Sequence, residues 1–487
     1  MNRNTLVIVA GLLVAVSGCT LAPDYNRPAA PIPDRWPGGP AYATTQPASA
    51  PADADLPPRR RFFRDSRLLH VVDLSLRNNR DLRLASLNVE RARAMYGVQR
   101  AELFPIVNAI ANGSQQRLPA DLSGTGSPLT VKQYGASLAL SAWEIDFFGR
   151  IRSLSEAAQQ QYFATEQARQ DTHILLVSSV ANAYLTLAAD REALTLARTT
   201  LQTQQEAYAL VKRRLDEGVI PELDLYRSQT QVDLARADLA RFTQAVAQDE
   251  NALNLLVGSP VPETLLPDEL GAVAPFLEIA PGLSSQVLLR RPDILQAEAL
   301  LKAAYANIGA ARAALFPRIT LTSSLGTGSN QLNGLFAAGS TAWSVAPEVV
   351  MPIFDARAWA ALRVTQVDKR LAVVRYERAI QTAFREVADS LAVRGTIDRQ
   401  IAAQESLVHA AAQTYKLSNG RYLKGLDSYL SVLDAQQSLY AAQQNLVRLR
   451  LARMANQVRL FSVLGGGWDH TTEGPPPQEG APAQAKR

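Results

Sequence analysis

The chain has 487 residues, of which 47% are apolar and 20% are charged. This composition excludes extended disorder over most of the chain and allows a sizeable buried core. The formal net charge is +5, but the basic residues are spread along the chain, so we do not expect nucleic acid as a partner. A single cysteine excludes an intramolecular disulfide and a zinc site with several cysteines.

The amino terminus has the layout of a bacterial export signal. Arg3 precedes a short apolar run over residues 5–16, which is too short to span a bilayer comfortably, and small residues follow it. Residues 16–19, Val-Ser-Gly-Cys, fit a lipobox, in which the cysteine becomes the acylated first residue. We therefore expect residues 1–18 to be a lipoprotein signal peptide and Cys19 to carry a covalent lipid such as palmitate. The alternative is an ordinary secretory signal with an incidental cysteine.

Residues 19–60 are predicted to form a lipid-anchored, extended segment. The stretch from Leu21 to about Pro58 is rich in proline and alanine, so it should not form the interior of a helix or a sheet. Thr20 stands where an aspartate would retain a lipoprotein in the inner membrane, which favours the outer membrane as the destination. Several acyl chains would anchor the protein firmly there, and the extended segment would lie on a folded surface.

The sequence repeats itself. The motif Leu-Phe-Pro at residues 103–105 recurs at 315–317, a spacing of about 212, and matches between Phe147 and Gly258 recur at a spacing of about 207. We expect two structural repeats flanked by less regular segments. The predicted boundaries are 61–258 for the first repeat, 259–282 for an equatorial linker, 283–465 for the second repeat and 466–487 for a tail.

Each repeat should contain a pair of membrane strands. Apolar residues alternate with small or polar ones over residues 134–141 in the first repeat and over 319–325 and 343–349 in the second. These runs have about 10 to 12 residues, the length that a tilted strand needs to cross a bilayer. Turns rich in glycine or proline are predicted at 118–128 and 326–339.

Helices should surround these strands. Residues 150–217 contain neither glycine nor proline, and 357–419 contain only Gly395, so each could form a rod of roughly 90–100 Å. A break near Gly218 and another near Gly425 would turn each rod back into a second helix, giving two antiparallel hairpins. The predicted helices are 66–102, 150–217 and 222–257 in the first repeat, and 283–315, 357–419 and 426–464 in the second.

One chain alone should be incomplete. Four strands cannot close a transmembrane barrel with an open interior, and a free strand edge in lipid leaves backbone groups unsatisfied. Three copies supply twelve strands, and the same symmetry places the helical hairpins side by side as a hollow cylinder. The expected fold class is therefore an α+β membrane protein, in which long hairpins form a trimeric α-barrel that is continued by a twelve-stranded β-barrel with four strands from each protomer.

Several motifs follow one another in a specific order. After the lipobox come Pro23-Asp24-Tyr25, the segment from Trp143 to Arg150, the paired Leu-Phe-Pro motifs, Pro352-Ile353-Phe354 and Leu433-Asp434-Ala435-Gln436. In this order they resemble the TolC-like outer-membrane efflux factors, specifically the NodT-type lipoprotein branch. The resemblance covers about residues 19–468 and implies the outer-membrane channel of a tripartite efflux system, a passive duct that carries small molecules from the periplasm to the outside.

The resemblance also implies partners. The chain has no nucleotide-binding motif, so energy would come from an inner-membrane pump, for which we expect the RND type, reached through a periplasmic adaptor protein. It further implies a homotrimer in contact with outer-membrane lipid, extending into the periplasm, and a part in multidrug resistance. The substrates stay open, because a wide lumen has little chemistry with which to select them.

The turns after the long helices are the expected periplasmic gate. By resemblance, Asp224 and Tyr422 match positions that link neighbouring helices in the closed state, and Leu430 and Asp434 match the rings at the constriction. Leu430 and Asp434 are four residues apart and therefore stack on one helical face, giving an apolar ring and an acidic ring in a trimer. The alternative for each residue is a solvated helix face or an ordinary interhelical contact.

The same turns are the expected docking place of the adaptor. Gly218 and Gly425 would permit the tight reversals, because glycine tolerates a positive φ. By resemblance, an adaptor docks in the grooves around them; the alternative is a purely geometric turn. Some relatives carry an arginine where this chain has Asp427 and an aspartate where it has Ser431, so their closed-state ion pair is in doubt here, and Arg421 is a nearby candidate substitute.

Catalysis and metal binding find no support in the sequence. The four histidines are far apart, and none has a second ligand at helical spacing that forms a known metal motif. No nucleophile elbow, phosphate loop or dinucleotide fingerprint occurs. We expect no enzyme, no metal and no cofactor apart from the lipid on Cys19. The alternative function is a lipid-anchored periplasmic coiled-coil scaffold or adaptor without a pore, which would not need strands of bilayer length.

Overall fold

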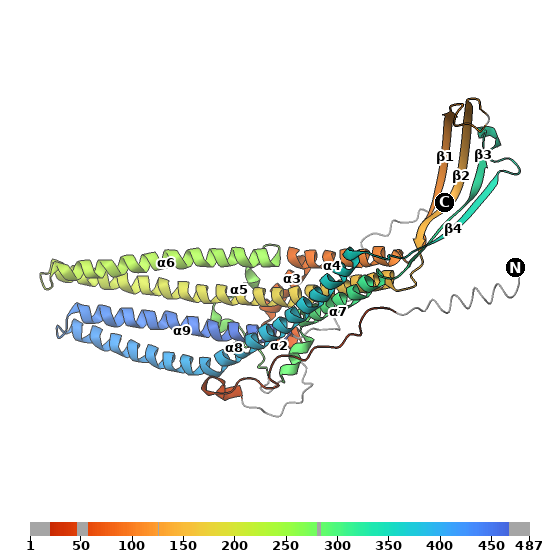
Figure 1. The fold of residues 1–487 in the computed structure, drawn as a ribbon. Coiled ribbons are helices and arrows are strands. Elements are labelled where there is room, and N and C mark those ends of the chain that lie inside the picture. Colours follow the sequence, from red (N-terminus) through yellow and green to blue (C-terminus); the bar gives the residue numbers. More distant parts are fainter. Residues whose placement is uncertain (1–19, 46–56, 125, 280–283, 467–487) are drawn as a thin grey trace, which may run out of the picture. The chain divides into compact units, whose positions relative to one another are not determined.

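The computed structural model describes residues 20–45, 57–124, 126–279 and 284–466. The order helix, two strands, long helical hairpin occurs twice in it (Figure 1). The first set is α3 (Ser66–Asn78), α4 (Arg80–Ala101), β1 (Val107–Leu118), β2 (Leu129–Glu144), α5 (Arg150–Asp216) and α6 (Glu222–Val257). The second set is the 3-10 helix η4 (Ser285–Arg290), α7 (Pro292–Ala313), β3 (Arg318–Ser329), β4 (Thr341–Val350), α8 (Ala356–Leu423) and α9 (Tyr429–Val463).

The chain forms two compact units, and each unit takes segments from both repeats. The strand unit contains the described residues of Met1–Ala29, Leu87–Glu166 and Gln296–Glu377. The helix unit contains those of Ala30–Ser86, Gln167–Leu295 and Arg378–Arg487. A repeat of the sequence is therefore not a unit of packing.

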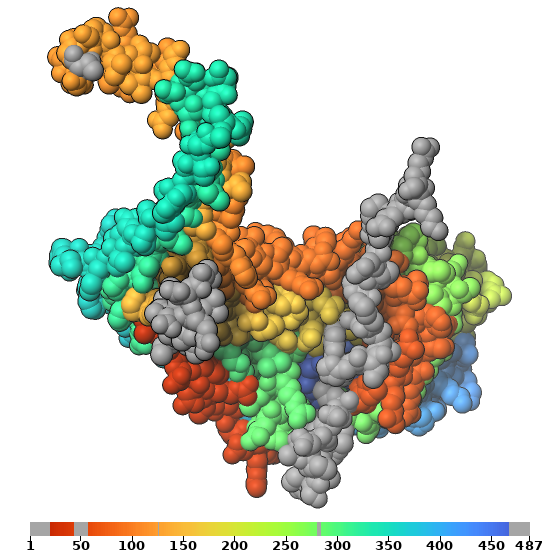
Figure 2. Space-filling view, turned by 90° about the vertical axis from the view of Figure 1, so that its right-hand side faces the viewer, coloured from red at the N-terminus to blue at the C-terminus, as the bar shows by residue number. Residues whose placement is uncertain are grey.

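In the strand unit, four antiparallel strands form one sheet in the order β1-β2-β3-β4. One row across the sheet is apolar and consists of Ala109, Leu138, Leu325 and Trp343. The next row is small or polar and consists of Asn108, Ala139, Ser324 and Ser344. The rows alternate because successive side chains of a strand point to opposite faces. Figure 2 shows the strands as a thin layer, and every residue of β4 is exposed.

Two features of the sheet differ from the sequence prediction. β3 continues to Ser329, so the prediction of a turn that begins at Gly326 is wrong by several residues. A Cβ atom at Gly326 would lie 2.2 Å from the carbonyl oxygen of Ala136, so this glycine allows β2 to approach closely and does not mark a turn. β2 has 16 residues, more than expected, and its register with β3 shifts between Leu140 and Trp143 at a bulge.

The motif from Trp143 to Arg150 joins β2 to α5. The Glu144 carboxylate accepts two hydrogen bonds of 2.8 Å from Arg150 and lies 2.7 Å from Nε of Arg318, the first residue of β3. Asp146 accepts hydrogen bonds from the backbone N–H groups of the first turn of α5. These ion pairs and hydrogen bonds fix the junction between the strands and the helices of the strand unit.

The long hairpins have the predicted form. α5 has 67 residues and α8 has 68, which corresponds to about 100 Å each at the rise of an α-helix. α8 runs to Leu423, so its predicted end at residue 419 is early, and Gly395 lies inside it. α5 also contains a stretch apolar enough to cross a membrane, but 61% of that stretch is buried inside the protein, as in a core helix.

The helices that precede the strands are shorter than predicted. The single helix predicted for 66–102 breaks at Asn79, whose side-chain oxygen accepts a hydrogen bond of 2.9 Å from the backbone N–H of Leu82 and so caps α4. The helix predicted for 283–315 begins as the 3-10 helix η4, and α7 starts at Pro292. A proline disfavours the helical conformation of the residue before it, here Arg291, which explains the break.

Aromatic stacking forms part of the core of the helix unit. Phe62, at the end of the short helix α2 (Arg59–Phe62), stacks on Phe461 of α9 with ring centroids 4.2 Å apart. Phe276, in the segment between the repeats, stacks on Phe62 with ring centroids 5.5 Å apart. Phe63 packs edge-on against Phe276 at 5.3 Å. All four rings are buried. Buried aromatic rings thus hold the segment between the repeats against the end of α9.

The described residues after the lipobox, 20–45, form a mostly extended segment on the protein surface, drawn in red in Figure 2. We call this segment the N-terminal strap. Its one helical part is the 3-10 helix η1 (Pro40–Thr45), which the sequence did not predict. In the helix unit the ring of Trp36 stacks on Phe384 at 5.0 Å, and Ser285 donates a hydrogen bond to the carbonyl of Pro33.

Candidate functional site

Both hairpins of the helix unit reverse through the same backbone turn. Gly218 has a φ of +71° and Gly425 a φ of +70°. The N–H of the following residue bonds back to the carbonyl of Arg214 at 2.9 Å in the first turn and of Arg421 at 3.0 Å in the second. This is the glycine cap by which many helices end. A Cβ atom at either glycine would meet nothing within 4 Å, so the positive φ and not the space calls for glycine.

A buried cluster joins the tips of the two hairpins. It consists of Val211, Tyr422, Tyr429, Val432 and Leu433, with Ile220, Leu225 and Tyr415 packed around it. Its members come from α5, α6, α8 and α9 and from the first turn, and the rings of Tyr422 and Tyr429 lie 5.2 Å apart. Because burying one such side chain contributes about 1.5–3 kcal/mol, this cluster is a substantial part of the contact between the tips. We call it the tip cluster.

Three contacts between the hairpins reinforce the tip cluster. The Tyr429 hydroxyl donates a buried hydrogen bond of 3.2 Å to Oγ of Ser228 on α6. The phenol is protonated at neutral pH and can donate, and burial raises the pKa of Tyr429 further. Arg214 on α5 places its guanidinium 5.0 Å from the ring centre of Tyr422 and donates to the carbonyl of Leu423 at 3.3 Å. The sequence prediction had none of these three cross-hairpin contacts.

Asp224 and Tyr422 do not bond to each other in the described chain. Tyr422 is 5% exposed, and its hydroxyl has no hydrogen-bond partner among the described residues. The carboxylate of Asp224 is largely buried and lies 3.7 Å from Arg227, one turn along the same helix. A buried hydroxyl without a partner is costly, so Tyr422 is available for a bond that one chain in this conformation does not make.

Leu430 and Asp434 lie on one exposed face of α9. Leu430 is 44% exposed, and Asp434 one turn later is exposed as well. Their neighbours Tyr429 and Leu433 lie on a different side of the helix and belong to the tip cluster. α9 therefore has one packed face and one open face, and the open face carries one apolar and one acidic side chain.

Arg421 pairs with Asp427 across the second turn. The two side chains approach to 2.5 Å, and a second contact measures 3.4 Å. The hydrogen bond from Arg421 holds the pKa of Asp427 below its ordinary value. The pair bridges one turn of one hairpin and both partners are exposed, so solvent and salt screen it.

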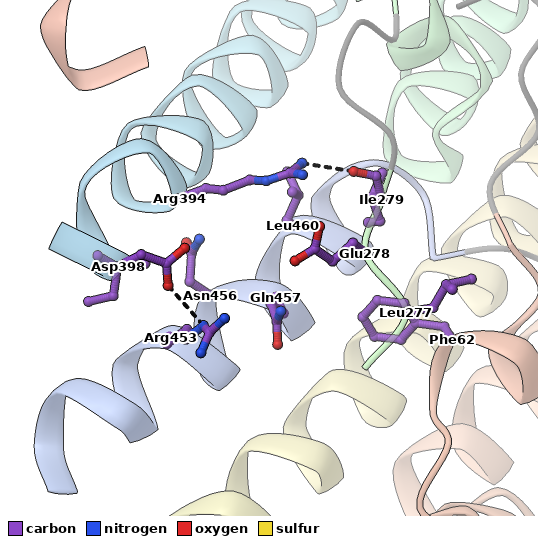
Figure 3. Close-up of a pocket in the computed structure, with 11 residues that line it drawn as sticks. Phe62, Leu277, Glu278, Ile279, Arg394, Asp398, Arg453, Asn456, Gln457 and Leu460 are labelled. Atoms are coloured by element: carbon purple, nitrogen blue, oxygen red, sulfur yellow. Dashed lines mark hydrogen bonds and ion pairs between the residues drawn. The ribbon is translucent and has the colours of Figure 1, made fainter. Parts of the chain in front are cut away.

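A pocket elsewhere in the helix unit has two charged side chains that are already partnered within the described chain. Figure 3 shows this pocket, in which Arg394 donates a hydrogen bond of 2.8 Å to the carbonyl of Ile279 and Arg453 pairs with Asp398 at 3.1 Å. Within the described ranges, no group of three His, Cys, Asp or Glu side chains could hold a metal ion. The predicted lipidation site, Cys19, lies outside the described residues.

Known proteins match almost the whole chain. A family model described as outer membrane efflux protein matches residues 71–259 and 283–466. Over 470 residues the chain is 46% identical to the toluene efflux pump outer membrane protein TtgC of Pseudomonas putida, and the match covers 96% of each protein.

Solved structures match the fold as well. A crystal structure of a membrane protein from Pseudomonas aeruginosa gives a TM-score of 0.85 at 42% identity, covering 92% of this chain and 98% of that one. The open state of the Neisseria gonorrhoeae MtrE outer membrane channel gives a TM-score of 0.81 at 36% identity, with coverage of 92% and 98%. Sequence and fold therefore agree over both repeats.

Proposed function

Since the chain belongs to the outer membrane efflux protein family and is an outer-membrane channel of an efflux system, we propose that it works as a homotrimer with one shared lumen. The observation that carries this proposal is the open sheet. β1 and β4 each pair with one neighbour only in the described chain, and most side chains on both faces are exposed. Pairing β4 of one copy with β1 of the next makes a closed barrel of twelve strands and leaves no edge in lipid.

The helical hairpins supply the periplasmic part of the duct. In a trimer each exposed residue of α9 becomes a ring of three, so Leu430 forms an apolar constriction and Asp434 an acidic one. Asp224 and Tyr422 are the proposed links between helices in the closed state, and Gly218 and Gly425 mark the tips at which an adaptor docks. The duct is passive and is no enzyme.

The family match places the chain in an efflux system. We assign the supply of energy for export to an inner-membrane pump of the RND type, which connects to the duct through a periplasmic adaptor. The relative TtgC is named for toluene efflux, and we extend this to small organic molecules here. The pump makes the selection, because a wide lumen with mixed side chains discriminates weakly between small molecules.

Lipidation of Cys19 is the remaining part of the proposal. Residues 1–18 would be removed as the signal peptide, and residues 19–60 would connect the acylated cysteine to the first repeat. Acyl chains contribute about 0.8 kcal/mol for each buried CH₂ group, so two or more of them hold a protein at a membrane. The strap of extended residues after position 19 is consistent with this tether.

Imaging of the particle tests the proposal. The full-length protein, purified in detergent, should appear as a three-fold cylinder with a lumen, and native mass spectrometry should give three times the mass of one chain. The same protein in liposomes should release small solutes. A monomer without a lumen would rule out the shared duct and would favour the lipid-anchored scaffold.

A further inference from the structure

Two aspartates face each other across the first hairpin. Asp190 on α5 and Asp249 on α6 lie within hydrogen-bonding reach of each other. The side-chain oxygen Oδ2 of Asp249 is buried and receives no hydrogen bond from any donor among the described residues. An ionised carboxylate can only accept hydrogen bonds, so two of them cannot bond to each other unless one carries a proton.

The two aspartates interrupt an apolar seam between the helices. The first lies four residues before Leu194 on α5 and the second three residues after Val246 on α6, and these two side chains pack in one apolar cluster. On the other side of the aspartates, Leu187 and Leu253 are fully buried. Residues three or four apart share a helix face, so the carboxyl groups lie between apolar neighbours on the packed faces of both helices.

The basic side chains nearby are bound to other acceptors. Arg191 donates a hydrogen bond of 2.7 Å to Glu250 and another of 2.9 Å to the carbonyl of Pro267, in the segment between the repeats. Farther along that segment, Arg67 of α3 pairs with Asp268 at 3.1 Å. Neither guanidinium makes an ion pair with the carboxyl groups of the seam in the described chain.

Burial and like charge act in the same direction on Asp249. Burial raises its pKa, the carboxylates of Asp190 and Glu250 raise the pKa further, and the value reaches about 7. Two carboxyl groups that interact strongly titrate as a pair and hold one proton between them over a range of pH. The seam therefore keeps a proton in slightly acidic solution and releases it in slightly alkaline solution.

The second hairpin has neutral residues at the same positions. At the repeat spacing of 207, Asp190 corresponds to Ile397, which is 6% exposed, and Asp249 corresponds to Asn456. The Asn456 amide donates a hydrogen bond of 3.0 Å to the carbonyl of Ser390. An apolar side chain and a neutral amide do not titrate, so at this level only the first hairpin responds to pH.

We propose that Asp190 and Asp249 share one proton between α5 and α6, and that this proton is a pH-sensitive clamp on the first hairpin. The shared proton replaces the repulsion of two carboxylates by a hydrogen bond. Because the folded protein binds this proton more tightly than the unfolded chain does, the clamp is complete below about pH 4 and is lost as the pH rises through about 7. The end of α6 and the segment held by Arg191 then loosen together.

Infrared spectroscopy tests the shared proton. The stretching band of a protonated carboxyl should be stronger in the purified full-length protein than in Asp249→Asn, and the difference should titrate near pH 7. Asp190→Asn should lower this midpoint by about one pH unit or more, because it removes the interaction within the pair. Asp233→Asn is the control, since Asp233 is exposed and paired with Arg236, and its spectrum at neutral pH should match that of the parent. A difference that titrates near pH 4, or a midpoint that Asp190→Asn leaves unchanged, would overturn the shared proton.

Hydrogen exchange tests the clamp. After correction for the intrinsic rate, amides of residues 246–257 in the intact protein should exchange faster by up to about tenfold for each pH unit above 7. Asp249→Asn should remove this extra dependence, and Asp233→Asn should keep it. No extra dependence in the parent, or the same dependence in Asp249→Asn, would overturn the clamp. Both aspartates belong to one chain, so failure of the proposed trimer or lumen would leave these results unchanged.

Discussion

Asn79 and Arg291 hold equivalent places in the two repeats. Each stands just before a helix that leads to the strands, and each donates a hydrogen bond to a carbonyl at the end of the helix that returns from the tip. The Asn79 amide reaches Leu256 at 2.8 Å, and the Arg291 guanidinium reaches Val463 at 2.7 Å. The two repeats thus close the same junction with a neutral side chain in one case and a charged one in the other.

Replacing these two residues should have unequal effects on stability. Arg291 is 9% exposed and also binds Asp293 and Glu386, so Arg291→Met leaves two carboxylates without their cation and should cost about 3–5 kcal/mol. Asn79→Ala removes a helix cap and one neutral hydrogen bond, which should cost about 1–2 kcal/mol. Denaturant unfolding followed by circular dichroism measures both. Similar losses of unfolding free energy in the two variants would show that the ion pairs of Arg291 add no stability beyond that of a neutral hydrogen bond.

A carboxyl group beside Arg291 should make stability depend on pH. Burial raises the pKa of Asp171 to about 6; Asp293 and Glu386 add to the rise, and Arg291 opposes it. The folded state then binds this proton more tightly than the unfolded state, whose aspartate has a pKa near 3.9. The contribution of Asp171 to stability is therefore greatest below about pH 4 and falls as the pH rises to about 6.

The matching substitution is Asp171→Asn, which removes the charge and keeps the shape. It should raise the midpoint of thermal unfolding at pH 7.5 and change it much less at pH 4, because there the carboxyl is protonated in the folded parent and about half protonated in the unfolded parent. Calorimetry of the two proteins at both pH values measures this difference. An equal shift at the two pH values would attribute the effect to packing and not to ionisation.

Much of the fold follows from local sequence signals. The rods of α5 and α8 were predictable because long stretches have almost no glycine or proline, and the two tips because Gly218 and Gly425 end those stretches. The break at Asn79 was missed because helical periodicity continues across it, whereas Pro292 in the sequence already signals the break at Arg291. Gly326 was assigned to a turn because the sequence does not show that a neighbouring strand passes close to it.

The candidate site was less predictable, because its contacts join residues far apart in the chain. Tyr429 and Ser228 are separated by 201 positions, and nothing in either repeat alone indicates their hydrogen bond. Arg421 was noted as a substitute partner for a gate ion pair, and the structure pairs it with Asp427 within one turn. The sequence shows Gly395 only as the single glycine in a long helix. Glycine is needed there because the N-terminal strap passes too close for a Cβ atom, which the sequence does not reveal.

The tip cluster should hold the two hairpins together more strongly than the ion pair does. Tyr429→Ala removes a buried ring and the hydrogen bond to Ser228, so it should raise single-channel conductance in planar bilayers. Asp427→Asn breaks an exposed pair within one turn and should leave conductance unchanged. A larger effect of Asp427→Asn than of Tyr429→Ala would mean that electrostatics, and not packing, holds the tips.

Tyr422→Phe separates two roles of Tyr422. Within the described chain its hydroxyl is buried without a partner, so in this conformation the substitution should be neutral or slightly stabilising. If the hydroxyl instead bonds Asp224 or a neighbouring protomer in the closed state, Tyr422→Phe should raise conductance while the melting temperature stays the same. Asp224→Asn should then raise conductance too. If Tyr422→Phe changes the melting temperature and leaves conductance unchanged, Tyr422 contributes to packing and not to the gate.

The open face of α9 should set conductance and ion preference separately. Leu430→Ser makes the proposed apolar ring smaller and polar, so conductance should rise with little change in the ratio of cation to anion permeability. Asp434→Asn removes one negative charge per chain and should lower that ratio, because an acidic ring attracts cations. Asp233→Asn on α6 is the charge-matched control, since Asp233 is exposed and already paired with Arg236. Unchanged conductance and unchanged permeability ratio in both α9 variants, measured under a salt gradient in planar bilayers, would remove Leu430 and Asp434 from the constriction.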